Sequence, residues 1–163
     1  MRTTVPLVDL EPGFVVHVAE TSATVVGSVW LRQDGFVWSE HLLQGAGLGG
    51  QWLSVEDDEG QLTVRLWTPR PDLTVQVTQP DGRWMRVDGR RWTRREKGEA
   101  EYLTEGRTPY GPSGRCEYAD YRHKDDRLSF ERFGTLPWDV STGRALPAAA
   151  VRAFREGDDA PRS

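Results

Sequence analysis

The sequence predicts a mainly β protein, with antiparallel strands forming a barrel-like or sandwich module of about 8–10 strands and one short C-terminal helix. The first observation is that short runs of β-branched and aromatic residues are separated by glycines and Asp-Gly pairs, which favour hairpin turns. The second is that apolar residues do not recur at helical spacing until the last part of the 163-residue chain.

In the first half, strands are expected at residues 14–18, 23–33, 36–43, 51–55, 61–67 and 73–78. Asp34-Gly35 predicts a type I′ turn, because both central residues of that turn need a positive φ. The run QGAGLGG at residues 44–50 lacks the GK[ST] ending of a phosphate-binding loop, so we interpret it as a flexible connection. The acidic run at residues 56–60 is interpreted as a solvated turn.

In the second half, Asp81-Gly82 and Asp88-Gly89 indicate further turns, and strands are expected at residues 99–105, 115–122 and 127–133. Residues 147–155 are expected to form the helix, because proline suits the first helical position and the three alanines after it favour helix. No linker divides the chain. Residues 1–157 are therefore expected to form one β-rich domain, and residues 158–163 a flexible tail.

Composition places the chain among ordinary globular proteins, with 37% hydrophobic and 28% charged residues. No apolar run approaches the roughly 20 residues that a membrane-spanning helix needs, and the first residues lack the apolar stretch of a signal peptide. The single cysteine, Cys116, suits a reducing compartment. We therefore expect a cytoplasmic protein. A net charge of −4 argues against a general nucleic-acid binder.

Four segments keep their order between about residues 10 and 145: GFVWSEHLL at 35–43, QWL at 51–53, DGRRW with GEAEY and EG within 88–106, and YADY with LSFE within 118–131. Together they resemble the bacterial domain-of-unknown-function family numbered 4178. His41 stands where that family usually has tyrosine, and Glu105-Gly106 inverts its usual Gly-Glu. The resemblance implies a β-rich cytosolic module, often encoded beside small membrane proteins and aminopropyltransferase-like enzymes in envelope-stress clusters. It supplies no catalytic residues.

Side chains suited to metal binding are present without a metal-binding motif; they are His17, His41, His123, Glu40, Asp120, Asp125 and Asp126. HExxH and paired short spacings are absent, and adjacent residues of a strand such as Glu40 and His41 point to opposite faces. Cys116 is interpreted as a small core residue of a strand. We therefore expect no enzyme activity, no metal and no cofactor.

Tryptophans lie on adjacent predicted strands, as Trp30, Trp38, Trp52 and Trp67, and either cluster in the core or line a groove. Alternation along residues 36–43 places Phe36, Trp38, Glu40 and Leu42 on one face. Glu40 then lies among aromatic rings and needs a buried donor such as an arginine. It is the first residue to test for a role in ligand binding.

The segment from Arg83 to Lys97 carries seven positive charges interleaved with Trp84 and Trp92. Arginine beside aromatic rings suits single-stranded nucleic acid or anionic lipid, and the residues proposed for such contacts are Arg90, Arg91, Trp92, Arg94 and Arg95. The alternative, favoured by the negative net charge, is a solvated hairpin whose charges pair with the acidic run at residues 56–59.

Three hypotheses for function follow. The leading one is a non-enzymatic binding or adaptor module in a membrane- or envelope-associated system, acting on another protein through a surface that includes Trp38, Trp52 and Trp67. The second is a small-molecule or polyamine-type ligand binder built around Glu40, which requires an internal pocket. The third is weak binding of single-stranded nucleic acid or peripheral association with anionic lipid through the arginine-rich segment, nucleic acid being the less expected partner.

Overall fold

The computed structural model describes residues 3–45, 47–77 and 79–155, and it consists almost entirely of antiparallel strands. The strands are β1 (Thr4–Val5), β2 (Val15–Val18), β3 (Thr21–Gln33), β4 (Phe36–Gln44), β5 (Trp52–Asp58), β6 (Gln61–Pro69), β7 (Trp84–Val87), β8 (Arg90–Gly106), β9 (Ser113–His123), β10 (Asp126–Phe133), β11 (Asp139–Leu146) and β12 (Val151–Phe154). Three short 3-10 helices, η1 (Leu7–Asp9), η2 (Pro71–Val75) and η3 (Ala148–Ala150), connect them.

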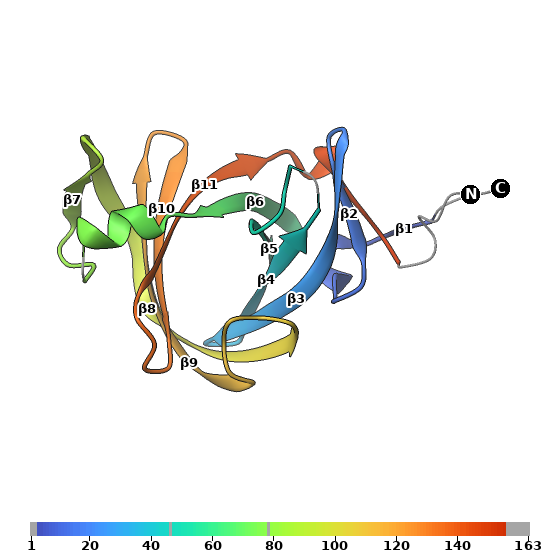
Figure 1. Cartoon of the computed structure of the whole chain (residues 1–163), viewed down its shortest axis with the longest axis horizontal. Coiled ribbons are helices and arrows are strands. Elements are labelled where there is room, and N and C mark those ends of the chain that lie inside the picture. The colour runs from blue at the N-terminus through green and yellow to red at the C-terminus, as the bar shows by residue number, and fades with distance from the viewer. Residues whose placement is uncertain (1–2, 46, 78, 156–163) are drawn as a thin grey trace.

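Eight strands close into a ring in the order β3-β4-β5-β6-β11-β10-β9-β8, because β8 also pairs with β3. Figure 1 looks into this ring, with β1 and β2 on one side of it and β7 on the other. The prediction of a mainly β, barrel-like module is confirmed. Closure gives every strand of the ring two hydrogen-bonded neighbours, which leaves the ring without an edge.

Tight hairpins set the register of the ring. Asp34 and Gly35 have φ values of 51° and 83°, and Asp88 and Gly89 have 55° and 75°, so both pairs occupy the left-handed region that a type I′ turn requires. The turn predicted at Asp34-Gly35 is confirmed. Gly82, in contrast, lies in a bend that precedes β7 and closes no hairpin.

One predicted strand is wrong, and one strand of the ring was not predicted. Residues 73–77 lie in and after the 3-10 helix η2, while residue 78, the end of the strand predicted there, is outside the described residues. Pro71 begins η2, and its Leu73 is buried against the outer face of the ring. Strand β11 was not predicted, since its sequence DVSTGRAL shows little apolar alternation.

The predicted C-terminal helix is also wrong, because residues 147–155 form only the single turn η3 followed by β12. Val151 and Ala153 are buried, and β12 pairs with both β2 and β1. Alternate burial and pairing with two strands outweigh the helical preference of three alanines. The predicted tail at residues 158–163 lies outside the described residues.

Much of the apolar packing lies outside the ring. One cluster joins the N-terminal segment, β2 and β12 to the outer faces of β5 and β6, for example through Leu10, Val16 and Leu53. A second cluster packs η2 and β7 against the outer faces of β9 and β10, where Tyr121 and Phe130 are fully buried. Because successive side chains of a strand alternate, these apolar outer faces turn many polar side chains inward.

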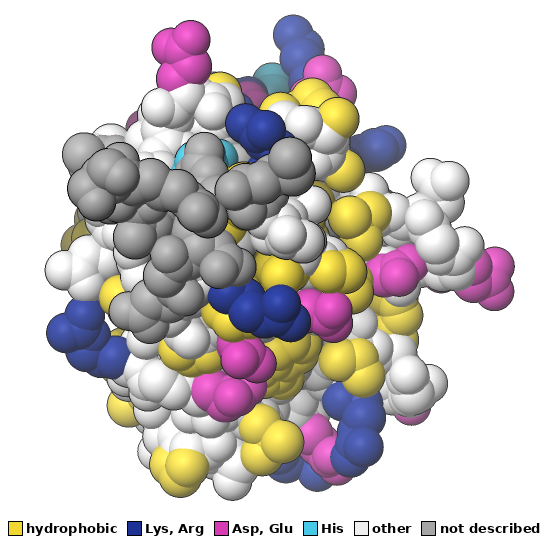
Figure 2. Space-filling view, turned by 90° about the vertical axis from the view of Figure 1, so that its right-hand side faces the viewer, with side chains coloured by type: hydrophobic (Ala, Val, Ile, Leu, Met, Phe, Trp, Pro, Cys, Tyr) yellow, Lys and Arg dark blue, Asp and Glu magenta, His cyan; other side chains and the backbone are white. Residues whose placement is uncertain are grey.

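The outer surface carries charges of both signs. Figure 2 shows the side of the molecule on which β1 and β2 lie, where basic and acidic side chains are scattered between hydrophobic ones. Among the described residues, no helix is long and apolar enough to cross a bilayer.

Candidate functional site

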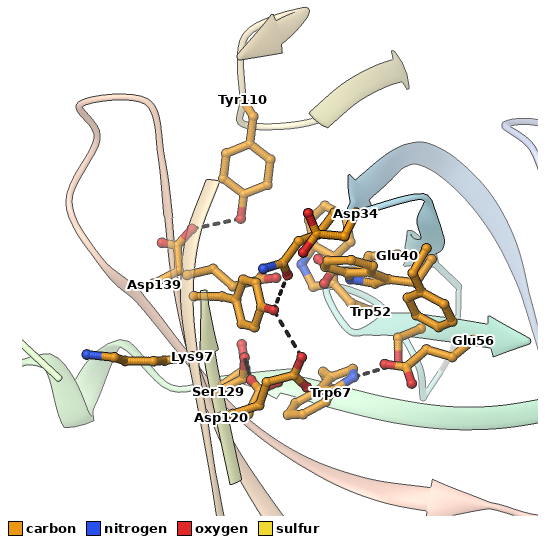
Figure 3. A pocket seen from close by; sticks show the side chains of 18 residues that line it. Asp34, Glu40, Trp52, Glu56, Trp67, Lys97, Tyr110, Asp120, Ser129 and Asp139 are labelled. Atoms are coloured by element: carbon orange, nitrogen blue, oxygen red, sulfur yellow. Dashed lines mark hydrogen bonds between the residues drawn. The ribbon is translucent and has the colours of Figure 1, made fainter. Parts of the chain in front are cut away.

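A cavity of about 340 Å³ lies inside the ring of strands, within the size range of small-molecule sites. Seven carboxylic side chains line it: Asp34, Glu40, Glu56, Glu96, Asp120, Glu131 and Asp139. Among the described residues that line the cavity, Lys97 is the one basic side chain. Figure 3 shows the Lys97 side chain pointing away from these carboxyl groups. The lining of the cavity is therefore strongly acidic, while Arg65 and Arg95 lie close enough to Glu56 to oppose the rise in its pKa.

Strand alternation explains how so many carboxyl groups gather there. Ser129 and Glu131 of β10 face inward while the intervening Phe130 is buried outside, and Tyr118 and Asp120 of β9 behave in the same way around Ala119. The ladder pairs Glu131 with Asp139 of β11, and Asp120 with Glu96 of β8. Acidic residues that are distant in sequence thus become neighbours inside the ring.

Glu40 and Glu131 form a hydrogen-bonded carboxyl pair. Burial raises the pKa of Glu40 to about 7, a rise that its hydrogen bond with Glu131 opposes and the nearby Asp120 and Glu56 reinforce. Burial and the Glu40 charge raise the pKa of Glu131 well above its ordinary value. The two groups therefore share a proton near neutral pH. The indole N–H of Trp38 also donates to Glu40, so the arginine expected as its donor is replaced by an indole and a carboxylic acid.

Asp120 is the second carboxyl group of the interior with a strongly changed pKa. Burial raises the pKa of Asp120 to about 7, and the nearby Glu131, Glu96 and Glu56 contribute to this rise. The hydrogen bond that the Ser129 hydroxyl donates to Asp120 over 2.8 Å acts in the opposite direction and lowers the pKa. Asp139, at the rim, accepts a 2.7 Å hydrogen bond from the Tyr110 hydroxyl, and burial raises its pKa as well. Within the described part of the chain, no cation is among the main groups that act on Asp120 or Asp139, so no opposite charge offsets the effect of burial on their pKa values.

Aromatic rings form much of the remaining wall. Trp52 and Tyr110 stack with ring centroids 6.0 Å apart, and Tyr110 stacks in turn on Phe133 at 3.7 Å. Trp38 meets Tyr118 edge-on at 5.8 Å. The indole N–H of Trp67 donates to Ser54 over 2.9 Å, which fixes that ring, as Figure 3 shows. Aromatic faces beside carboxylates provide the two kinds of surface that bind organic cations.

The structure brings together four of the residues predicted for the site: Trp38, Glu40, Trp52 and Trp67 all line the cavity. The predicted face of β4 that holds Trp38 and Glu40 is the inner face, and Glu40 does lie among aromatic rings. The adjacent His41 points to the opposite face of the strand, as predicted, and is buried between Ser28 and Ser39. Trp38, Trp52 and Trp67 thus line an interior, whereas Trp30 lies outside this cavity, beside His41, and its indole N–H donates to Glu105 over 2.6 Å.

The other five predicted residues, Arg90, Arg91, Trp92, Arg94 and Arg95, do not line this cavity. Arg90 pairs with Asp126 at 2.6 Å and lies over the ring of the buried Trp92, while Arg91 lies over exposed Trp84. Arg95 of this segment acts electrostatically on Glu56 of the acidic run and opposes the rise in the Glu56 pKa.

Sequence analysis missed several carboxyl groups of the cavity, namely Glu56, Glu96, Asp120, Glu131 and Asp139, as ligand-binding residues. The interpretation of residues 56–60 as a turn is wrong for Glu56, which lies in β5 and faces the cavity, while the turn itself is at Glu59-Gly60. The available signal was alternation: Ser129 and Glu131 are the polar members of LSFERF, with apolar residues between them.

Metal and thiol chemistry were also considered. Across residues 3–45, 47–77 and 79–155, no group of three or more His, Cys, Asp or Glu side chains is arranged to hold a metal ion. Cys116 is fully buried, and burial raises the pKa of its thiol, so the thiolate is disfavoured.

The family model described as "Domain of unknown function (DUF4178)" matches residues 11–148. The chain belongs to this family. The matched region includes every strand of the closed ring and all the carboxyl groups of the cavity, so the site described above lies within the DUF4178 region.

Similar proteins occur in mycobacteria. The uncharacterized proteins Rv2597 and MT2673 of Mycobacterium tuberculosis and Mb2628 of Mycobacterium bovis are each 36% identical to this chain over 152 residues. The similarity spans 89% of this chain and 71% of each relative. No solved structure matches the chain.

Proposed function

We propose that this DUF4178 protein is a non-enzymatic binding module that holds a small organic cation inside its ring of strands. The observation that carries the proposal is the cavity, in which seven carboxylic side chains surround a volume of about 340 Å³, while Lys97, the one basic side chain among the described lining residues, points away from them. A positively charged ligand balances the excess of carboxyl groups in this lining.

The electrostatic argument begins with the raised pKa values. Glu40, Asp120 and Glu131 resist ionisation because they are buried near other carboxyl groups. Charges interact more strongly there than in water, since the surrounding protein is less polarisable. A bound cation relieves the repulsion between these groups and favours their ionised forms, so the same features that raise the pKa values favour a cationic ligand.

The aromatic wall supports an organic cation in particular. Trp38, Trp52 and Trp67 present ring surfaces that pack against the carbon skeleton of a ligand and attract an ammonium group. This corresponds to the second hypothesis drawn from the sequence, a polyamine-type ligand binder around Glu40, for which an internal pocket was the structural requirement.

The non-enzymatic part of the proposal rests on how the polar groups are engaged. Glu131 is bonded to Glu40, Ser129 donates to Asp120, and Tyr110 donates to Asp139. Each of these four carboxyl groups is therefore fixed in place by a hydrogen bond to a neighbouring side chain, as is usual for a binding site. Hydrogen-bonded carboxyl pairs also serve in acid–base catalysis. Turnover of a bound amine would contradict this part of the proposal.

A comparison of three molecules with the same four-carbon skeleton tests the proposal. We expect 1,4-diaminobutane to raise the melting temperature at pH 8, whereas the neutral 1,4-butanediol and the anionic succinate leave it unchanged at equal ionic strength. Binding stabilises a folded protein by about 2.7 kcal/mol when the ligand is at 100 times its Kd. Stabilisation by the diol or by succinate, or no effect of the diamine, would refute the proposal.

A further inference from the structure

We propose that the cavity selects a linear molecule with two ammonium groups, one bound at Glu40, Glu131 and Asp139 and the other at Asp120 and Glu96. This inference rests on the proposed function and specifies its ligand. Two features carry it: the positions of the carboxyl groups in the strand ladder, and the aromatic rings that line the space between them.

The first centre contains three carboxyl groups from three strands. Glu131 of β10 is directly opposite Asp139 of β11 in the ladder, and it is hydrogen-bonded to Glu40 of β4. Like charges directly opposite each other in a sheet destabilise it, so this arrangement needs either a proton or a cation. One ammonium group with three donors matches a set of carboxylate acceptors.

The second centre lies one diagonal step further along the ladder. Asp120 of β9 is directly opposite Ser129 of β10 and, on its other side, opposite Glu96 of β8. Ser129 and Glu131 are two residues apart on one face of β10, so Asp120 is the diagonal neighbour of Glu131. Diagonal neighbours in a sheet are about 7–8 Å apart, so Glu131 and Asp120 occupy two adjacent positions of the ladder rather than one opposed pair.

Aromatic side chains line the space around the two centres. Tyr118 is directly opposite Glu131 in the ladder, and its ring meets Trp38 edge-on at 5.8 Å. Trp52 and Trp67 line the same cavity as Glu40 and Asp120, and Figure 3 shows all four side chains around it. A short methylene chain between two ammonium groups fits such a wall, because its apolar surface leaves water as it packs against the rings.

A single ammonium group leaves one centre unsatisfied. At acidic pH a proton neutralises that centre, because burial raises the pKa of Asp120 and of Glu40 to about 7. Above pH 7 the proton is lost, and a second ammonium group takes its place. The preference for a diamine over a monoamine should therefore increase as the pH rises from 6 to 8.

Calorimetric titration with 1,4-diaminobutane and with butylamine, which differ only in the second amino group, tests the inference. At pH 8 we expect the diamine to bind at least tenfold more tightly, and the ratio to decrease at pH 6. Asp120→Asn should reduce diamine affinity to near that of butylamine. Glu20→Gln, at an exposed position outside the cavity, should change neither affinity.

The outcomes separate this inference from the proposed function. If butylamine binds as tightly as the diamine to the unmodified protein, the two-centre arrangement is wrong, while the cation-binding function stands. If neither amine binds and the fold is intact by circular dichroism, both are wrong. The comparison of the two amines uses the unmodified protein, so it does not depend on how any variant folds.

Discussion

At the scale of single residues, Glu131 determines how the empty protein responds to pH. Its pKa is raised in the folded state by burial and by Glu40. The folded protein therefore binds more protons than the unfolded chain. The stability due to this group is fully present below about pH 4.5, its ordinary pKa, and is lost as the pH rises through its folded value.

Glu131→Gln should remove the loss of folding stability that ionisation of Glu131 causes at high pH, since glutamine is neutral and its amide still donates to Glu40. We expect the variant to be more stable than the unmodified protein at pH 8 by about 1–2 kcal/mol, because one unit of pKa corresponds to about 1.4 kcal/mol. The difference should shrink towards pH 5. Thermal unfolding of both proteins across this range measures it, with Glu20→Gln as the surface control. A variant less stable at pH 8 would contradict the assigned repulsion.

His41 has the opposite pH dependence and must be separated from Glu131. Burial lowers the pKa of His41 to about 3, so its contribution to stability is present above pH 6.5 and is lost as the pH falls. The unmodified protein therefore combines two opposing trends between pH 5 and 7. Comparing it with Glu131→Gln removes the contribution of His41, which is unchanged in both proteins, and reports on the coupled Glu40–Glu131 pair.

At the scale of elements, glycines on neighbouring strands make room for the rings of the cavity. Gly143 of β11 is opposite Trp67 of β6, and Gly98 of β8 is opposite Tyr118 of β9. A Cβ atom at Gly143 would lie 2.7 Å from Cδ2 of Trp67, and one at Gly98 would lie 2.8 Å from the Tyr118 hydroxyl oxygen. Each aromatic side chain therefore lies across a strand that bears no side chain at that position.

Gly143→Ala should displace the Trp67 ring. We expect a loss of about 1–3 kcal/mol of unfolding free energy through overpacking, together with weaker binding of 1,4-diaminobutane. Urea unfolding and calorimetric titration measure the two effects. Ala145→Ser, at an exposed position of the same strand, is the matched control. If Gly143→Ala matches the unmodified protein in both measurements, the close contact with Trp67 has no importance for stability or binding.

Most elements of the ring could be predicted from sequence, but the site could not. Alternation correctly grouped Trp38 with Glu40, and Asp34-Gly35 correctly marked a hairpin. Alternation separates the two faces of a strand without showing which face lies inside a closed ring. Strand β11 was missed for the same reason, because its inward residues Asp139 and Ser141 are polar, which removes the usual apolar signal.

At the scale of the whole molecule, closure of the ring creates the site. The β3–β8 pairing joins distant parts of the chain, for example Ser28 with Glu105, and no local pattern predicts it. The N-terminal segment, β2, β12, η2 and β7 cover the apolar outer faces of the ring. The hydrophobic packing therefore lies largely outside the ring, and the inner faces of its strands can carry polar side chains. A net charge of −4 describes the whole chain, whereas the interior concentrates acidic groups far beyond that average.

The most direct test of cation binding inside the ring is NMR observation of the tryptophan indole N–H signals during titration with 1,4-diaminobutane at pH 8. The interior set, Trp38, Trp52 and Trp67, should shift, and Trp38 most of all because its indole donates to Glu40. Trp84, which is 52% exposed, and Trp92 should not move. Shifts confined to Trp84 and Trp92, or none at all, would contradict the account.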